Sequence, residues 1–221
     1  MNDIAKNRWK KDIEKYNIPH LRLKQIAEIV KQIHPKSYVD LGCAKGTMGS
    51  LTPNINYIGC DFALDGNNIP FEFYHCDFNK ERLPNSLKGH SLICCSGLFE
   101  YIEDTNSFLN NINEILNNNG YLIVSYFNMN HFSRILKLLN GNSFPVHPDW
   151  RGFFSPKDFK KKLESNGFVI ERTIPVSHGF SASTSVDKTI ENKFRLPRLK
   201  FYSYLFAHQL IYVCKKKKDF F

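Results

Sequence analysis

Short apolar runs alternate with helical stripes along most of the chain, and this alternation restricts the possible folds more than any other feature. Strand-like runs occupy residues 37–41, 56–62, 71–78, 90–96 and 120–127, mostly bounded by Gly, Pro or Asn. Strands that are apolar throughout suit a sheet covered on both faces, and alternation with helices predicts mainly parallel pairing. We therefore expect an α/β fold around a mainly parallel sheet.

Helical stripes separate these strands. Apolar residues recur at helical spacing over residues 19–33, before Pro35, and again over 108–116, before an Asn-rich stretch that ends at Gly120. A third helix is expected to begin at Ser155, with Pro156 in its first turn, and to end at Asn166 and Gly167. Two further strands are expected at residues 168–176 and 207–213.

The composition fits one soluble domain. The chain has 221 residues, of which 42% are apolar, so we expect a single domain over 1–221. No signal-like or membrane-spanning apolar run is visible, and we expect a cytoplasmic protein. The six cysteines mostly fall in predicted strands without metal-ligand spacing, so we expect reduced, buried thiols and no metal site.

The first predicted strand runs directly into a turn of small residues. This segment, Val39 to Gly46, has Gly42, Ala44 and Gly46 at alternate positions. In open α/β sheets, ligands bind where such a turn meets a helix N-terminus beside the strand ends, and small residues let a ligand approach the backbone. Because Thr47 follows the turn, a dinucleotide motif does not fit, and a phosphate-loop motif is also missing.

Acidic residues end the next two predicted strands. Asp61 follows the turn by about twenty residues and is suited to accept hydrogen bonds from ribose hydroxyls. Asp77 could accept a hydrogen bond from an adenine amino group, while the ring of Phe78 could pack beside the base. The three strand ends together predict one nucleoside site.

With these motifs and the segments 94–101 and 120–125, the chain resembles class I S-adenosylmethionine-dependent methyltransferases. The resemblance implies a Rossmann-like three-layer sandwich with a seven-stranded, mainly parallel sheet whose last strand is antiparallel. It also implies S-adenosylmethionine as cofactor, S-adenosylhomocysteine as product, and N-terminal cap helices over residues 1–35. The residues expected to bind the cofactor are Asp40, Gly42, Cys43, Ala44, Gly46, Asp61, Phe62, Asp77, Phe78, Ser96 and Gly97.

By this resemblance Asp40 and the turn would hold the methionine part, and Ser96 and Gly97 would border the methyl-transfer site. Two residues depart from the family pattern. Ala44 stands where the middle glycine is usual, and Tyr101 stands where many relatives carry a histidine.

Two segments after the predicted strands, 128–155 and 177–206, are expected to be insertions on the substrate side. The stretch from His147 to Phe154 combines titratable groups, a cation and aromatic rings, which is typical of substrate binding but also of a plug over the sheet end. The residues expected to serve catalysis are His131, His147, Asp149 and Tyr101.

The acceptor is expected to be a small molecule, a sugar or a nucleotide-linked glycan precursor, as in polysaccharide biosynthesis. The net charge of +9 suits a phosphorylated acceptor and is compatible with contact of residues 194–206 with a membrane surface. An RNA methyltransferase and an inactive cofactor-binding relative remain as alternatives, although no Asn/Asp-Pro-Pro-Tyr motif follows the fourth strand. We expect a monomer or a homodimer.

Overall fold

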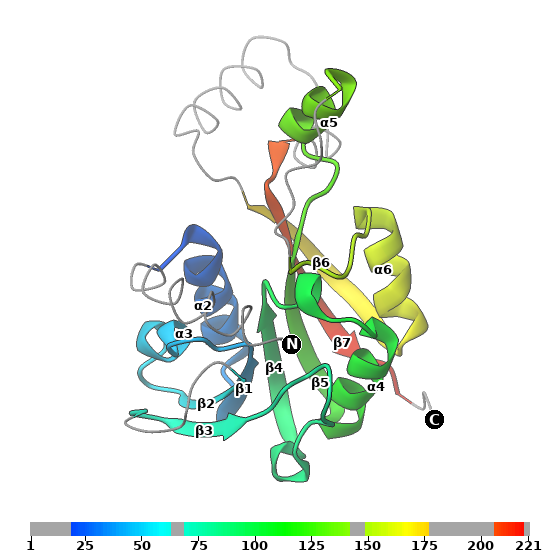
Figure 1. The fold of residues 1–221 in the computed structure, drawn as a ribbon. Coiled ribbons are helices and arrows are strands. Elements are labelled where there is room, and N and C mark those ends of the chain that lie inside the picture. The colour runs from blue at the N-terminus through cyan, green and yellow to red at the C-terminus, as the bar shows by residue number, and fades with distance from the viewer. Residues whose placement is uncertain (1–18, 63–68, 142–148, 177–205, 219–221) are drawn as a thin grey trace.

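The computed structural model describes residues 19–62, 69–141, 149–176 and 206–218. Seven strands form one sheet: β1 (Ser37–Leu41), β2 (Asn56–Asp61), β3 (Glu72–His75), β4 (His90–Ser96), β5 (Leu116–Phe127), β6 (Phe168–Val176) and β7 (Gln209–Lys216). Their order across the sheet is β3-β2-β1-β4-β5-β7-β6 (Figure 1).

Strands β1 to β5 pair in parallel, whereas β7 pairs antiparallel with both β5 and β6. The predicted mainly parallel sheet with an antiparallel last strand is confirmed. The strand order reverses between β1 and β4, which places the carboxyl ends of these two strands at the point where open α/β sheets bind ligands.

Helices cover both faces of the sheet (Figure 1). Helices α2 (Leu21–Ile33) and α3 (Thr47–Leu51) pack on one face, and α4 (Thr105–Ile115) and α6 (Pro156–Ser165) pack on the other. Short 3-10 turns are η2 (Asn85–Leu87) and η3 (Phe99–Tyr101). The predicted three-layer sandwich is thus confirmed, with a separate apolar core on each side of the sheet.

The cysteines belong to these two cores. All six are reduced and buried, as the sequence predicts. The adjacent Cys94 and Cys95 lie in different cores, because neighbouring side chains of a strand point to opposite faces.

The third predicted helix is confirmed as α6. The Ser155 hydroxyl accepts a hydrogen bond from the Asp158 N–H at 3.1 Å, Pro156 begins the helix, and Asn166 follows its last turn. This arrangement satisfies backbone donors that a helix N-terminus leaves without partners.

Several predicted boundaries were wrong. Helix α4 ends at Ile115 and β5 begins at Leu116, so the Asn-rich stretch 117–119, expected to be a loop, is part of a strand. The ammonium of Lys216 donates to the carbonyls of Asn113 and Leu116, at 2.6 and 2.9 Å, and satisfies acceptors at this junction. Strand β3 is shorter than expected because Asp77 begins a turn, in which its carbonyl accepts from the N–H groups of Lys80 and Glu81.

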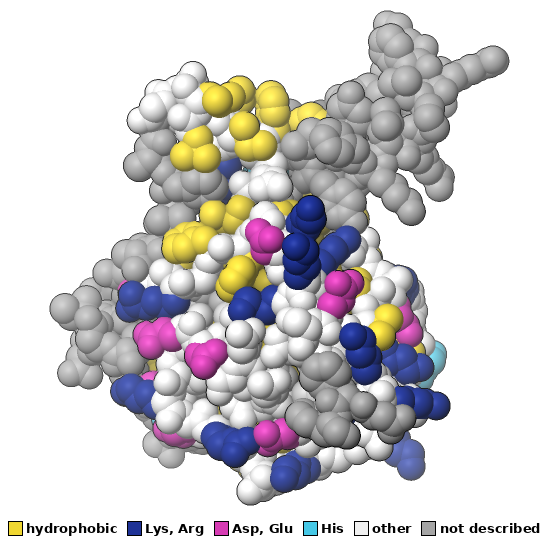
Figure 2. Space-filling model, turned by 90° about the vertical axis from the view of Figure 1, so that its right-hand side faces the viewer, with side chains coloured by type: hydrophobic (Ala, Val, Ile, Leu, Met, Phe, Trp, Pro, Cys, Tyr) yellow, Lys and Arg dark blue, Asp and Glu magenta, His cyan; other side chains and the backbone are white. Residues whose placement is uncertain are grey.

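Helix α5 (Phe132–Leu139) lies within the segment expected to be a substrate-side insertion and was not predicted as a helix. It follows β5 and extends beyond the carboxyl edge of the sheet (Figure 1). Figure 2 shows hydrophobic side chains gathered over it. No helix in the described ranges is long and apolar enough to cross a bilayer.

Candidate functional site

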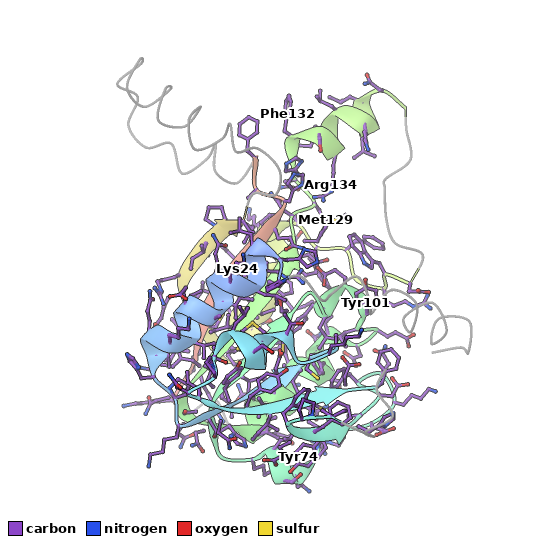
Figure 3. All side chains as sticks on the ribbon, turned by 90° about the vertical axis from the view of Figure 1, so that its left-hand side faces the viewer. Lys24, Tyr74, Tyr101, Met129, Phe132 and Arg134 are labelled. Carbon is purple, nitrogen blue, oxygen red and sulfur yellow. The ribbon has the colours of Figure 1, made fainter. Side chains whose placement is uncertain are left out.

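A pocket opens at the carboxyl edge of the sheet, beside the switch between β1 and β4. Among the residues predicted to bind the cofactor, those in its wall are Gly42, Asp61, Phe62, Asp77, Phe78 and Gly97. Two predicted catalytic residues, Tyr101 (labelled in Figure 3) and Asp149, line the same pocket. The topology therefore brings together the strand ends that the sequence analysis singled out.

The turn after β1 adopts a left-handed backbone at Gly42, Ala44 and Gly46, with φ values of 75°, 47° and 74°. The N–H groups of Gly42 and Cys43 donate to the carbonyl of Cys60 on β2, at 2.8 and 3.3 Å. At Gly46 packing also requires glycine, because a Cβ there would lie 2.1 Å from the Phe71 ring.

Asp61 connects this turn to the end of β2. Its Oδ2 atom accepts a hydrogen bond from the backbone N–H of Ala44 at 2.8 Å, and the carboxylate also faces the pocket. The side chain is buried to 6% exposure. One carboxylate thus fixes the turn and presents an acceptor to the pocket.

Asp40 lies at the end of β1 but is not among the described wall residues of the pocket. The Tyr57 hydroxyl donates to its Oδ2 at 2.9 Å, whereas its buried Oδ1 has no hydrogen-bond partner among the described residues. Burial raises the pKa of Asp40 from 3.8 to about 7, against the hydrogen bond from Tyr57, while nearby Asp61 raises it further. A cationic ligand group beside this carboxyl group would therefore stabilise its ionised form.

Asp77 and Phe78, which follow β3, supply a polar and an aromatic part of the pocket wall. Asp77 accepts from the N–H of Asn79 at 3.2 Å and lies 3.7 Å from the ammonium of Lys80, while the Phe78 ring packs on Phe108 with centroids 5.4 Å apart. The Asn79 amide joins this end to the turn η3. It donates to the Tyr101 carbonyl at 2.9 Å and accepts from the N–H of Glu103 at 2.9 Å.

Glu100 is a buried acid that the sequence analysis did not assign a role. Its Oε1 accepts from the N–H of Phe127 at 2.9 Å, and its buried Oε2 has no partner among the described residues. Burial raises its pKa, and the hydrogen bonds and the charge of Arg22 oppose that rise. Glu100 thus connects the end of β4 to the end of β5 directly below the pocket.

Arg22 is a second residue that sequence reasoning missed. A Cβ on Gly97 would lie 2.8 Å from its Nη1, and its charge lowers the pKa of both Asp40 and Glu100. The position of Arg22 follows from the topology. A helix that precedes a parallel strand runs in the opposite direction to that strand, so the first residues of α2 lie at the carboxyl edge of the sheet.

The segment 149–154 closes the other side of the pocket. The N–H groups of Arg151 and Gly152 donate to the Glu100 carbonyl, at 2.7 and 3.2 Å. The buried Tyr126 hydroxyl donates to the Gly152 carbonyl at 2.8 Å and accepts from the Phe154 N–H at 2.9 Å. These bonds hold Asp149 and Arg151 in the pocket wall, where Arg151 lies 3.7 Å from the carboxylate of Glu103.

Trp150 in the same segment packs edge-on against Phe127, with ring centroids 4.7 Å apart. Residues 149–154 therefore cover the end of β5 as well as lining the pocket. His147 itself lies outside the described residues, as do residues 177–205 and 1–18.

The remaining predicted residues lie away from the described pocket wall. His131 is the N-cap of α5, where its Nδ1 accepts from the Ser133 N–H at 3.2 Å and its ring stacks on His208 at 3.9 Å. Ser96 lies 3.5 Å from the Ser125 hydroxyl, and Cys43 belongs to the core under α2. No cluster of three metal-binding side chains occurs in the described ranges.

Comparison with known proteins identifies the architecture. The family model described as "Methyltransferase domain" matches residues 13–173. No curated protein matches the sequence.

Solved structures with the same fold include a Burkholderia thailandensis 1,6-didemethyltoxoflavin-N1-methyltransferase with bound 1,6-didemethyltoxoflavin and S-adenosylhomocysteine. It has a TM-score of 0.62 and 11% identity, over 97% of this chain and 88% of that one. The magnesium protoporphyrin IX methyltransferase of Synechocystis, with bound S-adenosylhomocysteine, has a TM-score of 0.61 and 15% identity, over 98% and 96% of the two chains. An S-adenosylmethionine-dependent methyltransferase from Mesorhizobium loti has a TM-score of 0.57 and 15% identity, over 88% and 100%.

Proposed function

The chain belongs to the methyltransferase-domain family, uses S-adenosylmethionine as its cofactor, and, we propose, methylates a hydroxyl group of a small acceptor such as a sugar or nucleotide-linked glycan precursor. The observation that carries this proposal is one pocket around which the ends of β1 to β4 place Gly42, Asp61, Asp77 and Gly97, with Asp149 also in its wall.

The residues present fit the cofactor. Asp61 and Asp77 offer carboxylate acceptors for ribose hydroxyls and an adenine amino group, and Phe62 and Phe78 offer rings beside the base. Asp40 keeps a buried carboxylate oxygen without a partner among the described residues, which suits a nearby ammonium group. Arg22 at Gly97 supplies a cation near the same end, where a carboxylate would be neutralised.

The cofactor supplies an electrophilic methyl group, so the protein has to align the acceptor and exclude water. The hydrogen bonds to the Glu100 carbonyl and to the Tyr126 hydroxyl hold the segment 149–154 in the pocket wall for this purpose. Asp149 is the residue we propose to accept the proton of the acceptor hydroxyl, and the Tyr101 side chain would position that hydroxyl.

Arg151 favours an acceptor that carries an anionic group. Its side chain is in the pocket wall, 51% exposed and 3.7 Å from Glu103, so it can turn toward a phosphate or carboxylate of the acceptor. Two neighbours of the same fold are named for small-molecule acceptors, toxoflavin precursor and magnesium protoporphyrin, which supports a small acceptor here as well.

Calorimetry with S-adenosylmethionine and S-adenosylhomocysteine is the first test, and no binding of either would overturn the proposal. The second is a search for metabolites that gain the mass of one methyl group when an extract is incubated with enzyme and cofactor. Asp149→Asn should lose that product while it keeps cofactor binding. A salt-sensitive gel shift with RNA, favoured only by the net charge of +9, would point instead to a nucleic-acid substrate. Binding without turnover across acceptor panels would indicate an inactive relative.

A further inference from the structure

Helix α5 has an inverted distribution of polar and apolar residues. Its Arg134 is only 6% exposed, whereas Phe132, Leu136, Leu138 and Leu139 are 45%, 42%, 46% and 76% exposed. A helix on the surface of a water-soluble protein normally buries its apolar stripe and exposes its charges. An apolar face that turns away from the core marks an interaction surface.

Specific contacts fix this orientation. The Arg134 guanidinium lies 3.7 Å above the centroid of the Phe127 ring and donates to the carbonyl of Asn128. His131 caps the first turn. Figure 3 shows Arg134 between α5 and the sheet, and Phe132 on the opposite side of the helix. Phe132, Leu136 and Leu139, which share one face of the helix, therefore point outward because the arginine anchors the other side.

Phe132 extends this exposed surface to Phe206, three residues before β7. The rings of Phe132 and Phe206 lie 5.8 Å apart between centroids, and Phe206 is 49% exposed. We call Phe132, Leu136, Leu139 and Phe206 the α5 patch. It projects from the edge of the sheet at which the pocket opens (Figures 1 and 2).

We propose that the α5 patch docks the protein on an anionic lipid surface. Helix α5 contains no acidic residue, and its Lys137 is exposed beside the apolar face. An apolar face flanked by cations is the pattern of helices that lie in the headgroup region of a bilayer. The protein as a whole carries a net charge of +9, which attracts anionic headgroups. The same charge makes a second copy of this chain a poorer occupant, because two copies repel each other.

Docking in this orientation brings the pocket edge toward the headgroups. This inference needs no methyltransferase activity, since it rests on α5 and the charge alone. Lipid binding and cofactor binding can therefore be measured separately, and either can fail without the other.

The test is cosedimentation of the full chain with vesicles of phosphatidylcholine alone or mixed with phosphatidylglycerol, at low and high salt. We expect binding to the anionic vesicles that weakens with salt. The double variant Leu136→Asp/Leu139→Asp should bind at least about tenfold more weakly, because it removes two insertable side chains and adds two anionic charges. Val169→Asp is the matched control. The exposed fraction of Val169, 47%, is similar to that of Leu136, 42%, but Val169 lies at the start of β6, at the opposite edge of the sheet.

Circular dichroism and thermal melting show whether each variant is folded, without any assumption about cofactor binding. A wild-type protein that stays in solution with both kinds of vesicle would overturn the proposal. Equal loss of binding in the Val169→Asp control would overturn it too. A wild-type dimer that ignores vesicles and dissociates in the double variant would assign the α5 patch to self-association instead.

Discussion

The two halves of the pocket edge are built differently. On the cofactor side, the ends of β1 and β2 are joined by backbone and carboxylate hydrogen bonds, and Asp40 and Asp61 are 2% and 6% exposed. On the acceptor side, beyond β5, the segment 149–154 is held by a few bonds from Glu100 and Tyr126, and α5 exposes an apolar face. The contrast indicates that the half where we propose the cofactor binds is a fixed element of the fold, whereas the half we propose for the acceptor is attached to it and can vary.

The largest effect should come from breaking the cofactor side at Asp61. Asp61→Ala removes the acceptor for the Ala44 N–H and the proposed ribose contact, so calorimetry should show a loss of S-adenosylhomocysteine affinity of about 10- to 100-fold. Asp61→Asn, which can still accept from Ala44, should lose less. Unchanged affinity in the alanine variant would place the nucleoside elsewhere.

The second prediction concerns how the charge of Asp40 affects cofactor binding. Because the pKa of Asp40 is raised to about 7, the carboxyl group is protonated in acid and attracts the cationic cofactor only when it ionises. Affinity for S-adenosylmethionine should therefore fall by up to about tenfold per pH unit below pH 7, and Asp40→Asn should flatten that profile.

Asp40→Asn should weaken cofactor binding but stabilise the ligand-free fold. A carboxyl group whose folded pKa lies above its unfolded value of 3.8 costs stability increasingly as the pH rises from about 4 to about 7. Asp40→Asn should thus raise the melting temperature of the ligand-free protein at pH 8 but not at pH 4. A lower melting temperature at pH 8 would show that the carboxylate stabilises the fold.

A smaller effect tests whether the acceptor side is independent. Tyr126→Phe removes the hydroxyl that bonds Gly152 and Phe154, which should lower the free energy of unfolding by about 1 kcal/mol. We expect kcat/KM for the acceptor to fall while calorimetry gives the wild-type Kd for the cofactor. A parallel loss of cofactor affinity would mean that the two halves are coupled.

The smallest effect concerns the base of α5. Burial, together with the charges of His208 and Arg134, lowers the pKa of His131 to about 4, so the neutral ring is favoured in the folded state. Between about pH 6.5 and pH 4 the unfolded helix binds the additional proton, and α5 should lose stability as the pH falls. The protection factors of the α5 amides, which correct the exchange rates for their intrinsic pH dependence, should fall as the pH is lowered through this range. His131→Asn, which can keep the cap, should show no such pH dependence.

The cofactor half could be predicted from sequence because its signals are local. Strand ends, the turn from Gly42 to Gly46 and the acids Asp61 and Asp77 each follow a recognisable apolar run, and parallel topology brings such ends to one edge. The packing reason for glycine at position 46 could not be predicted, because the Phe71 ring that a Cβ would meet lies on a distant part of the chain.

The acceptor half could not be predicted in the same way. Helix α5 has leucines at helical spacing, but nothing in that pattern says that they face outward while Arg134 is buried on Phe127. Glu100 likewise depends on long-range contacts with Phe127 and with the backbone of residues 151 and 152. Arg22 required knowledge of which end of α2 reaches the pocket.

The position of β7 has a consequence for how the protein is made. This strand is paired on both sides, and β6 pairs only with it among the described strands. On a ribosome, β1 to β5 can assemble as their residues emerge, but β6 has no neighbour until residues 209–216 have been synthesised. Residues 209–216 therefore complete the sheet from within, and a nascent chain stalled before them would expose the facing edges of β5 and β6 to chaperones or to aggregation.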